Sequence, residues 1–254
     1  MVNIILSGCG GRMGQAIVRA AKEYGDCRIL AGIDINADSI APACEFPVYQ
    51  SISELSDSAD VIIDFSHHTA LPALADYAVK TGTPLVVATT GHTEEEKAIM
   101  LDAAKKVAIF SSGNMSIGIN LIMELCKIGA ETLGEAFDVE IIEKHHNQKL
   151  DAPSGTALMI ADAIKEKRDQ TEYVYDRHAV RRVRDKSEIG IHSVRGGTIV
   201  GEHEVIFAGT NETITISHSA ASREIFANGA LRAAKYLAGK GAGIYDMSDL
   251  INGR

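Results

Sequence analysis

The first 112 residues alternate between short apolar runs and longer runs in which apolar positions recur with helical spacing. The short runs are typical of buried strands and the longer ones of amphipathic helices. Strands are expected at 4–6, 29–33, 61–65, 84–88 and 107–111, and helices at 14–24, 69–81 and 93–107. This alternation predicts an α/β fold with a doubly wound parallel sheet. In such sheets ligands bind beyond the carboxyl ends of the strands.

The pattern changes after about residue 116. A helical run at 119–133 leads to a strand-like run at 137–142, and strand-like runs follow at 189–195, 199–208 and 212–220. Strands grouped apart from helices predict an α+β domain. A last helix is expected at 225–238, with the tail packing back on the first domain. We therefore expect one domain at 1–116, completed by 225–254, a second at 117–224, and hinges near 113–118 and 222–227.

A glycine-rich turn joins the first expected strand to the first helix and reads Gly8-Cys9-Gly10-Gly11-Arg12-Met13-Gly14. Such a turn lets a pyrophosphate approach backbone N–H groups at a helix start, so it predicts a Rossmann-like dinucleotide site. Met13 stands where the third glycine of the common pattern would be. Asp34 ends the second strand, where a carboxylate can accept hydrogen bonds from ribose hydroxyls. Asp34 could also be a simple strand-end turn residue.

A second motif carries candidate chemistry and reads Glu143-Lys144-His145-His146-Asn147-Gln148-Lys149-Leu150-Asp151-Ala152-Pro153-Ser154-Gly155-Thr156-Ala157. Its end opens a helical run at 157–167, and a helix N-terminus binds anions through free N–H groups. Imidazole and ammonium groups just before that end indicate a pocket for a small carboxylate that must also receive a proton. The same composition also occurs in surface turns at helix starts.

Composition excludes several classes of function. The chain has 254 residues and a formal net charge of −9, which disfavours binding to nucleic acid or to an anionic membrane. No apolar run reaches the length of a membrane span, and no signal peptide is visible. Four cysteines lack C-x-x-C spacing. This distribution favours a reducing cytoplasm, with neither a disulfide framework nor a metal site.

With both motifs in view, the chain closely resembles the dihydrodipicolinate reductases, now called 4-hydroxy-tetrahydrodipicolinate reductases, over essentially its full length. The residues at 143–157 match that family's signature. Further matches are Gly8-x-Gly10-Gly11-Arg12-Met13-Gly14, Thr89-Thr90-Gly91, Asn114-x-Ser116-x-Gly118-x-Asn120, Gly201-Glu202-His203 and Ser222-Arg223-x-x-Phe226-Ala227-x-Gly229-Ala230. The resemblance implies a nucleotide-binding domain, a substrate domain with a mixed sheet, and a homotetramer formed through the substrate domains.

The resemblance also implies a reaction and the residues that carry it out. A hydride passes from NADH or NADPH to a cyclic dicarboxylate imine, in the diaminopimelate route to lysine. His145 would be the general acid/base and Lys149 the proton donor, while His146 with Ser154, Gly155 and Thr156 would bind substrate. The implied coenzyme contacts are Gly8, Cys9, Gly10, Gly11, Arg12, Met13, Asp34, Ala88, Thr89, Thr90, Gly113, Asn114, Met115 and Ser116.

Several points stay open at this stage. Either His145 or Lys149 could give the proton, and the chain could instead be an amino-acid or sugar dehydrogenase or a non-catalytic NADH-binding regulator. His67 and His68 depart from the family pattern, and we expect them in a solvated loop.

The remaining histidines are expected to differ in role. We expect His92, His178 and His218 to be bystanders and His203 to be a buried hydrogen-bonding residue. NADH is the expected coenzyme preference, because Asp34 would repel a 2′-phosphate and no Lys or Arg lies between 29 and 79.

Overall fold

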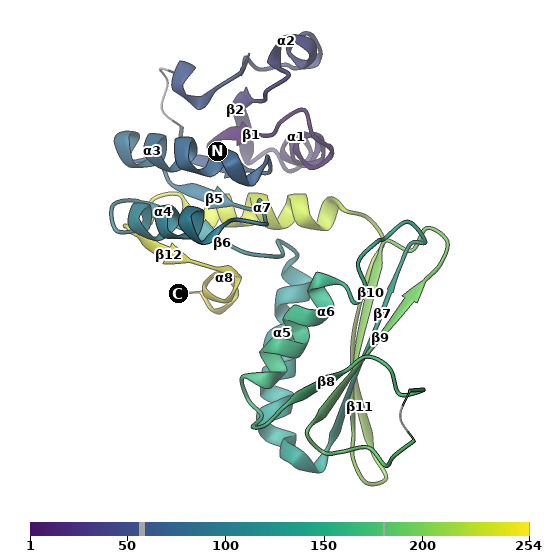
Figure 1. Cartoon of the computed structure of the whole chain (residues 1–254). Coiled ribbons are helices and arrows are strands. Elements are labelled where there is room, and N and C mark those ends of the chain that lie inside the picture. Colours follow the sequence, from purple (N-terminus) through teal and green to yellow (C-terminus); the bar gives the residue numbers. More distant parts are fainter. Residues whose placement is uncertain (56–58, 180, 254) are drawn as a thin grey trace. The chain divides into compact units, whose positions relative to one another are not determined.

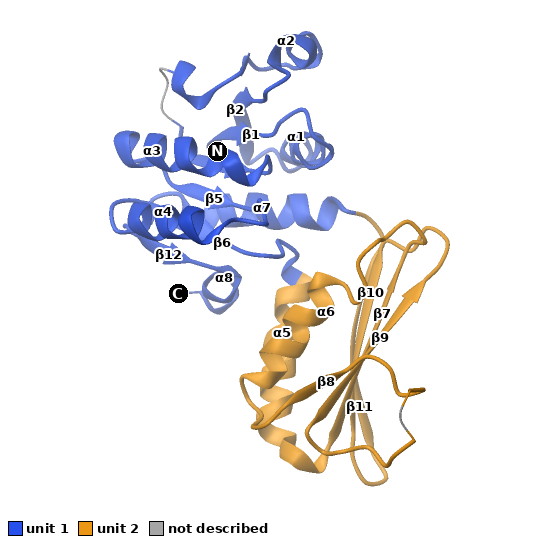
Figure 2. Ribbon diagram, viewed as in Figure 1, with its two compact units in different colours: residues 1–117, 223–254 blue, residues 118–222 orange. Residues whose placement is uncertain are grey.

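The computed structural model describes residues 1–55, 59–179 and 181–253, and the chain forms two compact units (Figures 1 and 2). Unit 1 contains residues 1–117 and 223–254, and unit 2 contains residues 118–222. These divisions fall within two residues of the expected boundaries. The chain therefore leaves unit 1 once, builds unit 2 from one continuous segment, and returns.

Unit 1 contains a seven-stranded sheet in which every described pairing is parallel. The order is β12 (Gly243–Tyr245), β6 (Ala108–Ser111), β5 (Leu85–Val87), β4 (Val61–Asp64), β1 (Val2–Ser7), β2 (Cys27–Ile33) and β3 (Val48–Tyr49). From β1 the sheet continues through β4, β5, β6 and β12 on one side and through β2 and β3 on the other. The loops after β1 and β4 thus lie at the switch point where doubly wound sheets bind ligands.

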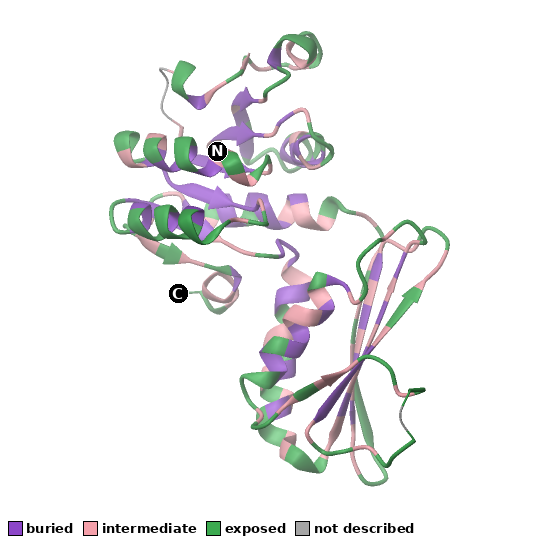
Figure 3. Ribbon diagram, in the orientation of Figure 1, coloured by how far each residue is buried: buried purple, intermediate pink, exposed green. Residues whose placement is uncertain are grey.

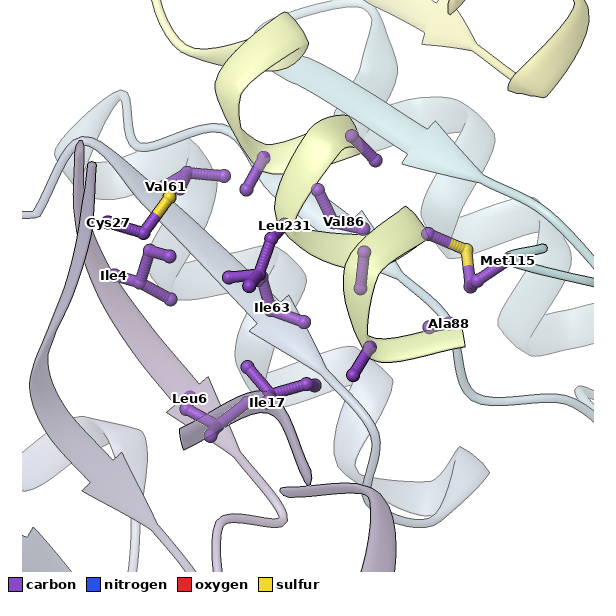
Figure 4. Packing of buried hydrophobic residues seen from close by; sticks show 14 of the residues in the cluster. Ile4, Leu6, Ile17, Cys27, Val61, Ile63, Val86, Ala88, Met115 and Leu231 are labelled. Carbon is purple, nitrogen blue, oxygen red and sulfur yellow. The ribbon is translucent and has the colours of Figure 1, made fainter. Parts of the chain in front are cut away.

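Helices cover both faces of this sheet, which confirms the predicted fold class. One hydrophobic cluster joins β1 side chains such as Ile4 and Leu6 to α1 (Arg12–Tyr24) and α7 (Glu224–Leu237) (Figure 4). The alternate residue Ile5 lies in a second cluster with α3 (Leu71–Thr81) and α4 (Glu94–Ala104). Each fully buried side chain of this size contributes roughly 1.5–3 kcal/mol. Figure 3 shows these central strands largely buried, whereas α3 and α4 also carry exposed residues.

The ends of the unit 1 helices follow from local chemistry. α1 begins at Arg12, two residues earlier than expected, after Gly11 in an extended conformation. α4 begins after Thr93, whose side chain forms a capping box with Glu96. The short α2 (Ala37–Ile40) follows β2. The tail forms β12 beside β6 and then α8 (Met247–Asn252), so the expectation that it packs on the first domain is confirmed.

Unit 2 contains a five-stranded mixed sheet. The order is β11 (Thr213–Ala220), β10 (Gly201–Ala208), β7 (Asp138–His145), β9 (Glu188–Arg195) and β8 (Glu172–Val174). β10 pairs antiparallel with both neighbours, and β9 pairs parallel with both of its neighbours. α5 (Ile117–Leu133) and α6 (Gly155–Lys165) share one hydrophobic cluster with this sheet. Within the described residues, the structure has no helix both long and apolar enough to cross a membrane.

Strand β7 corrects one expectation with a direct bearing on chemistry. It continues to His145 instead of ending at 142, because it pairs with β9 through His145 and with β10 through Lys144. Alternate residues of a strand face the same side. Glu143 and His145 are therefore buried on the same side as Val139 and Ile141.

Candidate active site

At its glycine positions Gly8 and Gly14, the glycine-rich turn is packed too tightly for a side chain. Gly8 has a φ of +77°, and a Cβ on it would lie 2.5 Å from the Phe65 carbonyl oxygen. A Cβ on Gly14 would lie 2.2 Å from the Gly8 carbonyl oxygen. Gly14, inside the first turn of α1, therefore permits the close packing of helix and strand that the third glycine gives in the common pattern.

A cavity of about 690 Å³ opens above this turn, and its walls include Gly8, Gly10, Gly11 and Asp34. The Asp34 carboxylate accepts hydrogen bonds from the backbone N–H groups of Gly10 and Asn36, each at 3.0 Å. No side chain caps the N-terminus of α1. The cavity thus combines a fixed carboxylate with an uncapped helix start, which suits a ribose joined to a pyrophosphate.

A second cavity of about 380 Å³ has walls formed by Ala88, Thr89 and Thr90 after β5. It shares Phe65, Ser66 and His67 with the first cavity. The loops that follow β1, β2, β4 and β5 are thereby brought together along one edge of the sheet. This arrangement can hold an extended ligand that reaches from Asp34 towards Thr90.

The other expected coenzyme residues differ in exposure. Cys9 is buried under the glycine turn, while Arg12 is exposed and Met13 half-buried at the start of α1. After β6, Gly113 is exposed, but Asn114, Met115 and Ser116 are buried. The Met115 side chain belongs to the hydrophobic core of unit 1.

In unit 2, the centre of the site is a buried ion cluster that holds His145. The His145 Nδ1 atom lies 2.6 Å from one oxygen of Glu143, a fully buried carboxylate. Arg195, at the end of β9, donates to both Glu143 oxygens at 2.8 and 2.7 Å, and the Ser154 N–H donates at 3.1 Å. Burial alone would raise the pKa of Glu143, but hydrogen bonds from groups including Arg195 and His145 hold it at about 2. An ionised Glu143 accepts from Nδ1, so Nε2 is the nitrogen of His145 left to exchange protons.

A second imidazole, His203 of β10, lies edge-on to His145 with ring centroids 5.3 Å apart. Its Nε2 lies 3.0 Å from Ser154 Oγ, which already accepts from the Ala157 N–H. Burial, reinforced by the neighbouring His145, lowers the pKa of His203 to about 4. His203 is therefore neutral near pH 7, and the expectation of a buried hydrogen-bonding residue is confirmed.

The start of α6 completes the unit 2 site. Ser154 caps this helix, Gly155 is exposed, and no other atom lies within 4 Å of where a Gly155 Cβ would be. On β10, a Cβ on Gly201 would approach His145 Nε2 to 3.1 Å, so glycine leaves that nitrogen uncovered. The Lys149 ammonium pairs with Asp151 at 2.9 Å.

His146 and Thr156 are half-buried, and both belong to the segments that flank this helix start. The printed contacts in unit 2 join Glu143, His145 and His203 to Ser154 at this helix start.

Sequence reasoning missed the roles of Glu143 and Arg195. The spacing of Glu143 and His145 could have revealed their shared face, but the strand was expected to end before them. Arg195 lies 52 residues from Glu143 and meets it only because β7 and β9 are neighbours. Within the described residues, no group of three or more His, Cys, Asp or Glu is arranged to hold a metal ion.

The structure gives His68 and His92 hydrogen-bond partners that the sequence did not reveal. The Nδ1 atom of His68 lies 2.9 Å from both oxygens of Glu96. The side chain of His92 is only 8% exposed, and its Nε2 lies 3.0 Å from the Thr89 carbonyl oxygen. Both histidines are held because β4 and β5 are adjacent, so the segments after them meet. His67 is exposed, as expected of a solvated loop.

Comparison with known proteins identifies the family. Residues 2–115 match the family model described as dihydrodipicolinate reductase, N-terminus, and residues 118–251 match the corresponding C-terminus model. The chain belongs to the dihydrodipicolinate reductase family. The expected family is therefore confirmed, and with it the expectation that the chain is an enzyme.

Individual relatives agree over the full length. The 4-hydroxy-tetrahydrodipicolinate reductase of Caldanaerobacter subterraneus subsp. tengcongensis is 53% identical, over 99% of this chain and 98% of the relative. The protein of the same name from Clostridium tetani is 47% identical, with the same coverage. A solved dipicolinate-bound dihydrodipicolinate reductase from Paenisporosarcina sp. TG-14 superposes with a TM-score of 0.81 at 26% identity, covering 97% of each chain.

Proposed function

We propose that this enzyme is a 4-hydroxy-tetrahydrodipicolinate reductase of the diaminopimelate route to lysine, and that its acid–base chemistry is centred on Glu143 and His145. The full-length relatives bear the name of that activity. The observation that carries the proposal is the ionised Glu143 that fixes His145 near the open start of α6.

The substrate is a cyclic dicarboxylate, as is the dipicolinate bound to the related reductase. One carboxylate accepts hydrogen bonds at the N-terminus of α6, from Gly155 and Thr156. The Lys149 ammonium exchanges its partner Asp151 for the substrate, which is possible because Asp151 is exposed. His146 contributes a further contact beside them.

NAD(P)H supplies the hydride, and the side chains of the enzyme orient the substrate and move the proton. Glu143 holds the His145 ring with Nε2 available, and Arg195 keeps Glu143 ionised so that it does not take the proton itself. We assign donation to Lys149, since its side chain is held by one exchangeable ion pair. His145, which is rigidly held, is suited to orient the substrate and to return a proton to the site.

The coenzyme fits unit 1. The adenosine ribose binds at Asp34, the pyrophosphate at the glycine turn, and the nicotinamide end extends along Ala88, Thr89 and Thr90. Gly8 and Gly10 support this placement. A Cβ on Gly8 would lie less than 3 Å from Phe65, and a Cβ on Gly10 less than 3 Å from Ile40. NADH is the preferred coenzyme, since Asp34 faces the position of the 2′-hydroxyl.

We further propose that the enzyme acts in the cytoplasm as a homotetramer assembled through unit 2. The family resemblance supports the assembly, and the four cysteines, all free thiols, support a reducing compartment. Light scattering coupled to gel filtration measures the assembly directly, and a monomeric mass would contradict it.

The test of the proposed function is NADH oxidation in the presence of the product that the preceding synthase forms from pyruvate and aspartate semialdehyde. We expect NADH oxidation with that substrate, and no reduction of NAD+ with a panel of sugars and amino acids. Turnover with the panel alone would favour a dehydrogenase. Binding of NADH without any turnover would favour a regulator.

A further inference from the structure

The carboxylate of Glu96 in unit 1 does more than cap a helix. Glu96 is the third residue of α4, and its N–H donates to Thr93 Oγ1 at 3.2 Å while its Oε2 accepts from the Thr93 N–H at 2.9 Å. A capping box needs no further partners. Nevertheless, Glu96 is buried, and two histidines from outside α4 approach its oxygens.

The first is His68, which begins the 3-10 helix His68–Ala70 after β4. Its Nδ1 lies 2.9 Å from each Glu96 oxygen. The hydrogen bond from His68 is the main reason that the pKa of Glu96 lies below its ordinary value. An ionised carboxylate only accepts hydrogen bonds, so His68 donates and thereby ties the loop after β4 to α4.

The second is His92, two residues after the turn formed by Thr89 and Thr90. Its Nε2 lies 3.0 Å from the Thr89 carbonyl oxygen, and since a carbonyl can only accept, Nε2 carries a proton. Its buried Nδ1 has no hydrogen-bond partner among the described residues and lies 3.6 Å from Glu96 Oε2. The ring therefore spans two acceptors, the Thr89 carbonyl on one side and the Glu96 carboxylate on the other.

This network controls one wall of the 380 Å³ cavity. Thr89 and Thr90 form that wall, and Ser66, His67 and His68 contribute further lining. Backbone contacts also hold the turn, since the Ala88 N–H donates to the Asp64 carbonyl at 3.0 Å. Glu96 and His92 line neither of the two cavities, so they act on a ligand only through the turn.

We propose that Glu96 and His92 are positioning residues that hold the turn of Thr89 and Thr90 in place for the coenzyme, and so set its affinity. The proposal rests on the proposed coenzyme role of that turn. It predicts that disturbing either residue weakens NADH binding without changing the chemistry. A purely structural network would change stability alone.

The first experiment uses two substitutions of His92. His92→Phe keeps a ring but removes the donor to the Thr89 carbonyl, whereas His92→Gln can supply an amide N–H near the position of Nε2. We expect His92→Phe to raise the dissociation constant of NADH by roughly tenfold, the effect of losing one good hydrogen bond, with kcat at saturating NADH within about twofold. We expect His92→Gln to stay within about threefold of the unchanged enzyme.

The second experiment uses Glu96→Gln, which covers the case in which His92→Phe does not fold. Glutamine still completes a capping box, so α4 keeps its start. It removes the charge that accepts the hydrogen bond from His68 and lies beside His92, and we expect the NADH dissociation constant to rise by about five- to tenfold. The matched control is Glu94→Gln in the same helical turn, where Glu94 is exposed and pairs with Lys97. That variant should bind NADH normally.

The outcomes separate the inference from the function on which it rests. Normal NADH affinity in both His92→Phe and Glu96→Gln, with or without a lower Tm, overturns the positioning role while leaving the reductase intact. Equal weakening in Glu94→Gln also overturns it, because general charge is then the cause. If the unchanged enzyme fails to bind NADH at all, the coenzyme role of the turn is wrong, and the inference falls with it.

Discussion

The two units each contain a buried glutamate bonded to histidine, but they stabilise its charge differently. Glu143 in unit 2 is completely buried and accepts hydrogen bonds from the two terminal guanidinium nitrogens of Arg195. Glu96 in unit 1 lies at the start of α4, where the Thr93 N–H, the helix dipole and the imidazole of His68 stabilise it. No arginine is bonded to it among the described residues.

The difference indicates what each glutamate is for. The permanent charge of Arg195 neutralises Glu143, so His145 can gain or lose a proton while its ring keeps its orientation. The Glu96 carboxylate is paired with histidine instead of a permanent positive charge. Its network therefore holds loops together and has no separate charge to stabilise a catalytic proton transfer. On the proposed function, similar side chains thus serve a proton-exchanging centre in one unit and a loop support in the other.

The largest expected effect comes from Lys149→Ala. If Lys149 donates the proton, this variant should lose about 10²–10⁴-fold in kcat, the usual contribution of a general acid, with coenzyme binding nearly unchanged. Steady-state rates and an NADH titration measure the two effects. Lys165→Ala, at the other end of α6, is the control and should keep full activity. Retention of more than about a tenth of kcat in Lys149→Ala would show that Lys149 is not the donor.

The second prediction tests the role of Arg195. Arg195→Met leaves Glu143 buried without its compensating charge, so the free energy of unfolding should fall by about 3–5 kcal/mol. Urea unfolding measures this change. The double variant Arg195→Met with Glu143→Leu should be more stable than the single variant, because no buried charge remains. A double variant less stable than Arg195→Met would contradict the electrostatic explanation.

The third prediction concerns acid stability and His203. The pKa of His203 in the folded protein is about 4, below its ordinary value of 6.5, so the unfolded chain binds the extra proton first. Stability should therefore decrease as pH falls from about 6.5 towards 4, by roughly 3 kcal/mol from this residue. His203→Gln should flatten that part of a stability profile. The contribution of Glu143 is present above its ordinary pKa of 4.5 and is lost only as pH falls further, towards 2.

The smallest effect sharpens the description of unit 1. We expect NADH to be favoured over NADPH by about tenfold or less in kcat/KM, because Asp34 repels a 2′-phosphate and the exposed Arg12 recovers part of the loss. Both constants should be measured at one ionic strength. Arg12→Ala should widen the preference. A clear preference for NADPH would show that Asp34 does not face the 2′ position.

The candidate coenzyme region could be proposed from the sequence because its residues are close in the chain. The glycine turn lies between one strand and one helix, and Asp34 follows the next strand, so hydrophobic periodicity and spacing were sufficient to place these elements. The acid–base region was only partly accessible in this way. His145, Lys149 and the helix start at Ser154 share one segment, but the partner that keeps Glu143 charged lies on a different strand.

What the sequence by itself determined was the doubly wound sheet, the separate mixed-sheet unit, the family and the two chemical motifs. Each depends on local periodicity or on a short run of residues. Only the tertiary structure decided how the charges are paired. The β7–β9 register places His145 beside Arg195, and the adjacency of β4 and β5 brings His68 to Glu96. Strand order and register are set by packing over the whole sheet, so residues far apart in the chain meet without any local signal.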